Sequence, residues 1–509
     1  MAAFACATPL FAQEPADALR YSWYIPGGSA RQQAIGGAMT SLGGDISATF
    51  VNPAGLGFYR TSDFVLTPGY NFLNNKSTYY GRTEKDDKQN LSFGTTGVVS
   101  GFGGQKKNGK SYSTAVSLAI NRTASFGDNL LYRGLNNQNS YSQKFLEEIA
   151  SHNDKDANSV ASNYPFGTSL AFNTYWIDTI AGGSSGNYQF QTRAPITTGL
   201  IQENRVTTKG GITELALGLA ANRNEKWLYG LTVGVPFLWY DKKATFTEAD
   251  ATANTNNKFD YAYINENVTT KGTGVNLKLG VIYKPVEYVR LGLAVHTPTF
   301  FVLTDKYNAS VTTNTESYQG EQTQSSSLFT NGTDASYKYW MFTPYRVMFS
   351  GAYVLREVQD VRKQRGFITA DIEYVNYKSS SYTTASESGS DQGAKDYFKS
   401  LNRAIDNAYK GAFNFKVGGE LKFTTIMARL GAAYYGNPYK DLGQGEKGRK
   451  FQLSGGLGYR NKGIFIDATY VYTNGKDMNY AYRLANTPFS GAAVKTATGN
   501  IVLTVGFKI

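Results

Sequence analysis

Residues 501–509 read IVLTVGFKI, and this stretch indicates the fold of the chain. Every second residue is large and apolar: Ile501, Leu503, Val505, Phe507 and Ile509. Since side chains alternate between the two faces of a strand, the stretch predicts a strand with one apolar face. A free strand edge invites aggregation, whereas the last strand of a transmembrane β-barrel closes against the first. We therefore expect a barrel whose last strand pairs with the segment near 63–72, with Phe507 and Ile509 facing lipid and Lys508 facing the wet side.

The composition favours a barrel and excludes several other classes of protein. Aromatic residues make up 14% of the chain and glycine is abundant, which suits a lipid-facing surface around a polar lumen. The net charge of +12 comes from scattered residues and not from a basic recognition motif, so we expect no nucleic-acid partner. Cys6 is the only cysteine and there are two histidines, so we expect no disulfide, metal site or cofactor.

The first residues predict export. Residues 1–13 (MAAFACATPLFAQ) are apolar and small, as in the last part of a secretory signal, with a lipobox at Cys6 as the less favoured alternative. No stretch approaches the roughly 18 apolar residues of a membrane helix. Export without such a helix points to the bacterial outer membrane, where lipid and anionic lipopolysaccharide would surround the protein.

Alternating patterns recur along the chain and predict an all-β fold of fourteen antiparallel strands. The predicted strands are 63–74, 89–102, 111–123, 207–221, 227–246, 268–284, 288–303, 342–354, 366–379, 411–423, 426–436, 450–460, 463–473 and 499–509. Short and long connections alternate, which is typical of periplasmic turns and extracellular loops. We therefore expect a transmembrane barrel over 63–509, with both termini in the periplasm.

The long connections contain helical patterns. Phe145 and Ile149 share one face of a predicted helix in the connection 124–206, and Phe172 and Trp176 lie in a second apolar stretch. A third amphipathic pattern covers 394–409. These groups either pack together as a cap on the barrel or form an extracellular groove for an apolar ligand.

Residues 14–62 precede the first strand and do not alternate, so we expect them to fill the lumen as a plug, or hatch. Within them Asp45 is followed by Asn52-Pro53-Ala54-Gly55-Leu56. This stretch is either a simple turn, since proline restricts φ and asparagine favours turns, or the anchor of the hatch on the inner wall.

At this motif the chain resembles the FadL/TodX family of outer-membrane transporters of long-chain fatty acids and other hydrophobic compounds. The segments GVIYKP (280–285), ARLGAAY (428–434) and LGYR (457–460) support the resemblance. It implies a fourteen-strand barrel with an N-terminal hatch, ligand capture at the extracellular loops, a lumenal pocket, a hatch rearrangement and lateral exit through a gap in the wall. It also implies a hydrophobic ligand. Apart from the resemblance, Arg290 or Arg429 is our candidate for a cation that pairs with a fatty-acid carboxylate.

The wall gap of that family lies at a kink in the third strand. The predicted third strand here, 111–123, has no glycine or proline. Those residues mark bulges and broken pairing, and they occur in the strands before it. The second strand is therefore the predicted gate, and the candidates are Gly94, Gly97, Gly101 and Pro68.

We find no catalytic constellation and expect no enzyme. Asp371 and Glu373 share one face of a strand, but a charge ladder with Lys416 and Glu420 explains them better than an acid–base pair. His296 is expected to be a polar lumen residue. The main functional hypothesis is uptake of hydrophobic molecules, and the alternative is a structural barrel that binds other outer-membrane proteins of a secretion or assembly complex.

Overall fold

The computed structural model describes residues 14–25, 27–107, 110–184, 186–355, 365–385 and 392–508. The predicted signal segment 1–13 and the predicted lipid-facing Ile509 lie outside these residues. Among the residues described, no helix is both long enough and apolar enough to cross a membrane.

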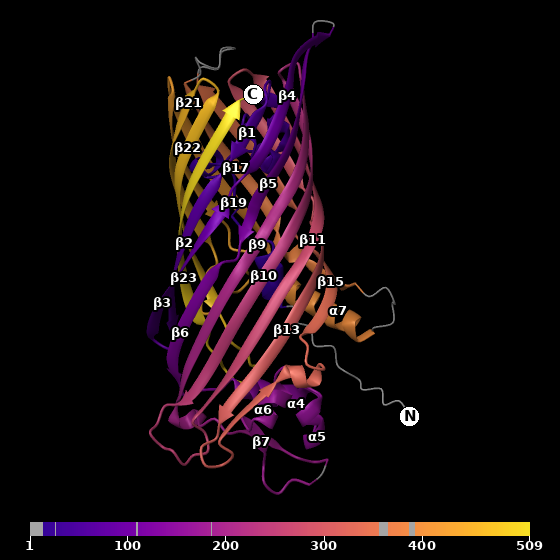
Figure 1. Cartoon of the computed structure of the whole chain (residues 1–509), viewed down its shortest axis with the longest axis vertical. Coiled ribbons are helices and arrows are strands. Elements are labelled where there is room, and N and C mark those ends of the chain that lie inside the picture. The colour runs from indigo at the N-terminus through magenta and orange to yellow at the C-terminus, as the bar shows by residue number, and fades with distance from the viewer. Residues whose placement is uncertain are drawn as a thin grey trace.

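The wall is one antiparallel sheet that closes on itself as a fourteen-strand barrel (Figure 1). Several wall strands consist of two segments separated by a short interruption. In chain order the strands are β1 (Asp63–Leu66) with β2 (Pro68–Tyr79), β3 (Arg82–Phe93) with β4 (Thr96–Lys107), β5 (Lys110–Ser125) with β6 (Asp128–Asn136), β9 (Leu200–Arg223), β10 (Trp227–Asp250), β11 (Tyr261–Val286), β12 (Val289–His296) with β13 (Phe300–Asn314), β15 (Ala335–Phe342) with β16 (Arg346–Leu355), β17 (Gly366–Asn376) with β18 (Ser381–Thr384), β19 (Gly411–Phe423), β20 (Ile426–Tyr435), β21 (Lys450–Asn461), β22 (Ile464–Asn479) and β23 (Ala492–Lys508).

The last strand closes the barrel. β23 pairs with β22 on one side and with β1 and β2 on the other, in a register that places Asp63 opposite Lys508 and Gly69 opposite Val502. Phe507 is 46% exposed on the outer surface, and Lys508 is also exposed at the end of the strand. The predicted pairing of the last strand with the first is therefore confirmed.

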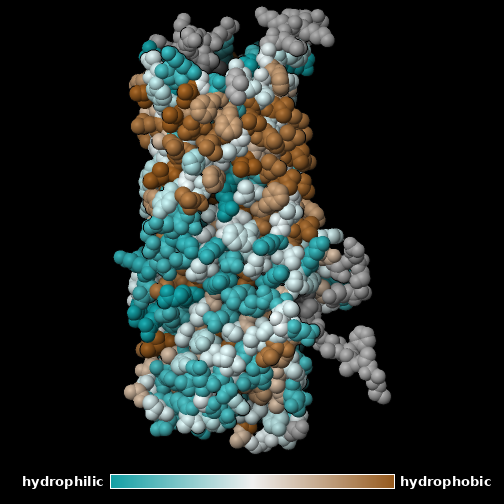
Figure 2. Space-filling view, in the orientation of Figure 1, coloured by the Kyte–Doolittle hydropathy of each residue, from teal (hydrophilic) through white to brown (hydrophobic). Residues whose placement is uncertain are grey.

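Alternation of side chains gives the barrel an apolar outer band (Figure 2). The band lies toward the end with the short turns, and the wall continues beyond it as a mostly hydrophilic surface toward the end with the long loops. β9, β10 and β11 have 24, 24 and 26 residues, whereas a transmembrane strand needs about 9–11. The predicted strands 207–221, 227–246 and 268–284 are shorter than β9, β10 and β11. The outward alternation of apolar residues stops where the band ends, while backbone pairing continues.

Several connections predicted as loops contain segments of wall strands, including β18 in 380–410. The connection 124–206 includes β6 and the first residues of β9, and 304–341 includes most of β13, the strand β15 and the short strand β14 (Glu321–Ser325). The predicted patterns around Phe145 and Ile149 and over 394–409 form the helices α4 (Ser142–Ser151) and α7 (Gln392–Ala408). The second apolar stretch is helical only in α6 (Thr168–Asn173), and α5 (Ala157–Ser162) was not predicted. The same loops contain β7 (Ile177–Thr179), β8 (Phe190–Thr192) and the 3-10 turns η2 (Ile196–Thr198), η3 (Ser326–Phe329) and η5 (Tyr377–Ser379).

The hatch, residues 14–62, lies inside the wall. It contains α1 (Pro15–Arg20), α2 (Ala30–Ala34), α3 (Ala48–Val51) and the 3-10 turn η1 (Pro53–Phe58). α2 contacts β20, β21, β22 and β23, whereas η1 contacts β9, β10 and β11. Because these strands belong to different parts of the wall, the segment crosses the lumen.

Candidate functional site

Asn52 and Pro53 pack directly against the inner wall. The Asn52 side chain donates from Nδ2 to the carbonyl of Thr40 at 2.6 Å, and its Oδ1 accepts from the amide of Ala54 at 3.1 Å. A methyl group at Gly280 would overlap the Asn52 side chain, and one at Gly230 would overlap the Pro53 backbone. The motif therefore serves both as a turn and as the contact between hatch and wall, which needs glycine on the facing strands.

Two sets of charged wall residues hold the rest of the hatch. Asp371 Oδ2 accepts from the amides of Met39 and Thr40, both at 3.0 Å, and from the Thr40 hydroxyl. Arg31 of α2 forms an ion pair of 3.3 Å with Glu420, which also pairs with Arg429 at 2.6 Å. Arg429 continues the chain of charges to Asp467 at 2.5 Å in the wall. Removing Glu420 would leave the buried Arg31 of the hatch without its carboxylate partner in the wall, which is strongly destabilising.

The wall has an interruption between its second and third strands. β4 pairs with β5, and β3 pairs with β2, while β6 pairs with β9. Within the described residues, no backbone ladder joins β3 to β6, although the two segments lie side by side. The backbone ladder between the second and third strands therefore stops where both strands are broken, at Gly94–Thr95 and at Phe126–Gly127. We call the unpaired boundary between β3 and β6 the seam.

Side chains close this seam in place of a backbone ladder. Lys88 donates to the side chain of Asn129 at 3.1 Å, and Asn129 donates to the carbonyl of Asp87 at 2.9 Å. A Cβ atom at Gly127 would lie 2.5 Å from Asn90 Nδ2, so these two residues already touch. Side-chain contacts of this kind can separate without breaking a backbone ladder.

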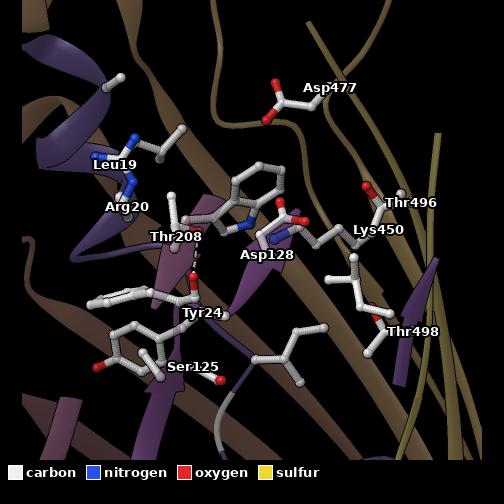
Figure 3. A pocket seen from close by; sticks show the side chains of 18 of the residues that line it. Leu19, Arg20, Tyr24, Ser125, Asp128, Thr208, Lys450, Asp477, Thr496 and Thr498 are labelled. Atoms are coloured by element: carbon white, nitrogen blue, oxygen red, sulfur yellow. Dashed lines mark hydrogen bonds between the residues drawn. The ribbon is translucent and has the colours of Figure 1, made fainter. Parts of the chain in front are cut away.

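A cavity of about 1150 Å³ lies between the hatch and this seam. Residues on both sides of the interruption line it, including Asn90, Gly94, Phe126 and Asp128. Figure 3 shows the hatch residues Leu19, Arg20 and Tyr24 around the same space as Ser125, Thr208 and Lys450. Its walls combine aromatic rings with cationic and hydroxyl groups, so the cavity suits an elongated, mostly apolar molecule with a polar end.

The cavity also reaches the loop helices. Tyr141, at the start of α4, and Lys144 within it line the cavity from the end with the long loops. Lys144 Nζ lies 5.4 Å from the centre of the Tyr141 ring, within the range of a cation–π contact. Burial raises the pKa of the Tyr141 hydroxyl to about 12, so it is neutral at pH 7. The cavity therefore connects the loop end of the barrel with the seam.

A chain of hydrogen bonds connects the hatch to the interruption. Asp45 accepts from the Ser29 hydroxyl at 2.8 Å and from the Ser47 amide at 2.9 Å. The Ser47 hydroxyl accepts from the Ser29 amide at 2.8 Å and donates to Thr95 Oγ1 at 3.1 Å. Thr95 lies between β3 and β4, and a methyl group at the adjacent Gly94 would overlap the carbonyl of Gly28. The hatch therefore contacts the broken strand directly at these residues.

The predicted ligand residues lie elsewhere. Phe145, Ile149 and Trp176 are 2%, 4% and 0% exposed in a hydrophobic cluster of the loop helices, with Phe172 packed against it. Arg429 is enclosed in the ion-pair chain, and Arg290 stacks on the ring of Phe58 at 4.5 Å. None of these six residues is among those that line the cavity in the described chain. Their role in ligand binding stays a prediction.

The predicted gate residues lie near the interruption. Gly94 lines the cavity directly, Gly97 pairs with Ala119 where β4 meets β5, Gly101 packs on the hatch at Tyr59, and Pro68 begins β2 opposite Phe93. Sequence reasoning missed the other side of the seam, Phe126-Gly127. The sequence contains a signal for this strand, because Leu130 and Tyr132 follow the Phe126-Gly127 pair at alternate positions. In the structure these two residues and Asn136 are buried on one face of β6.

The remaining charged residues of the lumen have structural partners. Glu373 pairs with Lys416 at 2.9 Å, as the predicted charge ladder requires, and with Arg346 at 3.2 Å. Asp371 and Glu420, the other predicted members of the ladder, bind the hatch instead. His296 Nε2 lies 2.8 Å from the carbonyl oxygen of Val51 in the hatch. In the described part of the chain, no group of three or more histidine, cysteine, aspartate or glutamate residues is placed to hold a metal ion.

Comparison with solved structures identifies the fold. A Pseudomonas aeruginosa FadL homologue superposes with a TM-score of 0.53 at 12% identity, over 96% of this chain and 99% of that chain. The Pseudomonas putida toluene transporter TodX gives a TM-score of 0.51 at 12% identity, with the same coverage. No family model matches the sequence, and no curated protein matches it. The likeness shows that the chain has the barrel fold of these two proteins.

Proposed function

We propose that this chain is a bacterial outer-membrane channel for hydrophobic molecules such as long-chain fatty acids, with both termini in the periplasm. The loop helices capture the ligand, the cavity holds it, and the hatch rearranges to let it leave sideways between β3 and β6 into the membrane. The observation that carries the proposal is the cavity itself, since residues from both sides of the unpaired seam line it. The barrel fold that the chain shares with a FadL homologue and a toluene transporter also supports this proposal.

Lateral exit follows from the chemistry of such ligands. Each CH₂ group transferred from water to an apolar environment gains roughly 0.8 kcal/mol, so a long acyl chain strongly prefers the bilayer to an aqueous channel. Phe93 and Leu91 are 57% and 81% exposed on the outer face of β3, directly beside the seam. An apolar ligand that leaves the cavity here therefore meets apolar side chains on its way into the lipid.

A disulfide across the seam tests this route. A Cβ atom at Gly127 would lie 2.9 Å from Asn90 Cγ, which places the two Cβ atoms within about 4.5 Å, the range of a disulfide. In the variant Asn90→Cys with Gly127→Cys, we expect oxidation to reduce uptake of a labelled long-chain fatty acid to the level of cells without the protein. Reduction should restore it.

The matched control places a disulfide in a fully paired seam. Leu457 and Ala468 face one another across β21 and β22, so Leu457→Cys with Ala468→Cys crosslinks the wall without touching the interruption. Uptake by this variant should not depend on the redox state. If the oxidised seam variant still takes up fatty acid at the normal rate, lateral exit between β3 and β6 is wrong.

A further inference from the structure

Four lysines lie in direct register across four adjacent strands beside the seam. Lys85 of β3 faces Lys76 of β2, Lys76 faces Lys495 of β23, and Lys495 faces Lys476 of β22. All four side chains are exposed on the outer surface. We call these residues the lysine row. Side chains directly opposite one another in a sheet lie about 5 Å apart, so three pairs of like charge repel each other here.

Carboxylates of the chain only partly offset this repulsion. Lys476 forms an ion pair of 3.0 Å with Glu446. In the described part of the chain, Lys76, Lys85 and Lys495 form no ion pair with a carboxylate, although Asp87 lies two residues from Lys85 on the same face of β3. The row therefore presents an excess of positive charge.

Protection of a free edge does not explain the row. Lysine on an exposed edge strand prevents unwanted pairing with other strands. This explanation accounts for Lys85, because β3 borders the seam. Lys76 and Lys495, however, lie on β2 and β23, which are paired on both sides. A row of ammonium groups across fully paired strands is stabilised best by an anion with several charged oxygens.

The position of the row indicates which anion that is. Phe72 and Tyr470 stack at 6.2 Å on the outer surface, and Lys76 lies four residues beyond Phe72, about 13 Å farther along the strand. Figure 2 shows a hydrophilic surface beyond the apolar band on the side of the barrel where β2, β3 and β23 lie. The row thus lies where the charged headgroups of the outer leaflet begin.

We propose that the lysine row binds the phosphate groups of a phosphorylated glycolipid of the outer leaflet, next to the seam between β3 and β6. This rests on the proposed function only in its placement of the barrel in an outer membrane with the long loops outside. Bound glycolipid would neutralise the row and fix the outer edge of β3, one side of the seam.

Binding of purified full-length protein to lipid A, an acylated glucosamine disaccharide with two phosphates, tests the proposal. For Lys76→Gln with Lys85→Gln and Lys495→Gln, we expect native mass spectrometry to show about 100-fold weaker binding, at about fivefold for each lysine. The wild type should bind dephosphorylated lipid A as weakly as this variant does. Removing the same charge from the loops, in Lys155→Gln with Lys399→Gln and Lys447→Gln, should leave binding unchanged.

Thermal stability provides a second readout that does not depend on lipid. Lys76→Glu places a carboxylate between Lys85 and Lys495, so without lipid A it should raise the melting temperature while abolishing lipid A binding. A variant that is merely misfolded would melt lower. Unchanged binding by the triple variant, or equal binding of the dephosphorylated lipid, would overturn the lysine-row proposal.

The two proposals fail separately. Fatty-acid transfer into vesicles of phospholipid alone should be the same for the triple variant and the wild type, because no glycolipid is present. If the triple variant loses lipid A binding but transfers fatty acid normally, the lysine-row proposal is supported. If oxidation of the seam variant leaves uptake unchanged, only lateral exit between β3 and β6 is contradicted.

Discussion

At the scale of single residues, the wall has glycine at positions on its inner face that contact the hatch, as at Gly280 and Gly431. Gly280 lies beside Asn52 of the hatch, and Gly431 lies beside Gly36. A side chain at these positions would occupy the space of the hatch. The sequence shows the glycines as interruptions of strand patterns, but their purpose becomes visible only when the hatch is placed.

A single methyl group tests this packing. We expect Gly280→Ala to displace the Asn52 motif and loosen the hatch, because the new Cβ atom would overlap the Asn52 side chain. Single-channel recordings should show larger or more frequent openings, and trypsin should cleave the hatch faster. Gly351→Ala is the control, since its Cβ atom would meet only Leu291 Cδ2 at 4.0 Å. Equal conductance of the two variants would contradict the role of Gly280.

At the scale of elements, the seam results from two strands that are broken at the same height. Beyond Gly94 the inward positions of β3 are polar, namely Glu84, Asp86, Lys88 and Asn90. These side chains hydrogen-bond across the seam or meet solvent and do not form a packed apolar layer. The hatch contacts the interruption through Ser47 and Thr95, so we expect a change in the position of the hatch to alter the seam.

Removing one hydroxyl tests this coupling. Thr95→Val keeps the shape of the side chain but removes the hydrogen bond to Ser47, at a cost of about 1 kcal/mol. We expect faster hydrogen exchange of backbone amides near Gly28 and Thr96 and an altered rate of fatty-acid uptake, with an unchanged melting temperature of the barrel. Thr78→Val is the control, because it removes the bond of 2.9 Å to Thr83 at a hairpin end far from the hatch. If both variants exchange alike, Thr95 does not couple the hatch to the seam.

At the scale of the whole molecule, the wall and the hatch depend on each other unequally. The wall closes through antiparallel strands that are mostly neighbours in sequence, while the pairings of β1 and β2 with β23 and of β5 and β6 with β9 join more distant segments. The wall strands are joined to one another by backbone ladders. The hatch, in contrast, is held by wall groups such as Asp371 and Glu420.

Deleting the hatch should therefore leave a folded barrel with an open lumen. We expect the protein without residues 14–62 to keep the shift in electrophoretic mobility on heating that marks folded barrels, and to conduct ions continuously in planar bilayers. Shortening the exposed loop tip 252–257 should affect neither property. Failure of the deletion variant to fold would show that the hatch is part of the folding core and not a removable plug.

Local patterns in the sequence predict the closed fourteen-strand wall, helical segments in the long loops and an N-terminal segment that precedes the wall. Alternation of side chains and the positions of turns are local properties, so they can be recognised along the chain. Local patterns do not reveal where the wall is open, which residues line the cavity, or that Lys85, Lys76, Lys495 and Lys476 form one row. These features depend on the register between paired strands, and the row includes the pair Lys76 and Lys495 from opposite ends of the chain. Such register is set by closure of the barrel and by packing of the hatch, which no local pattern records.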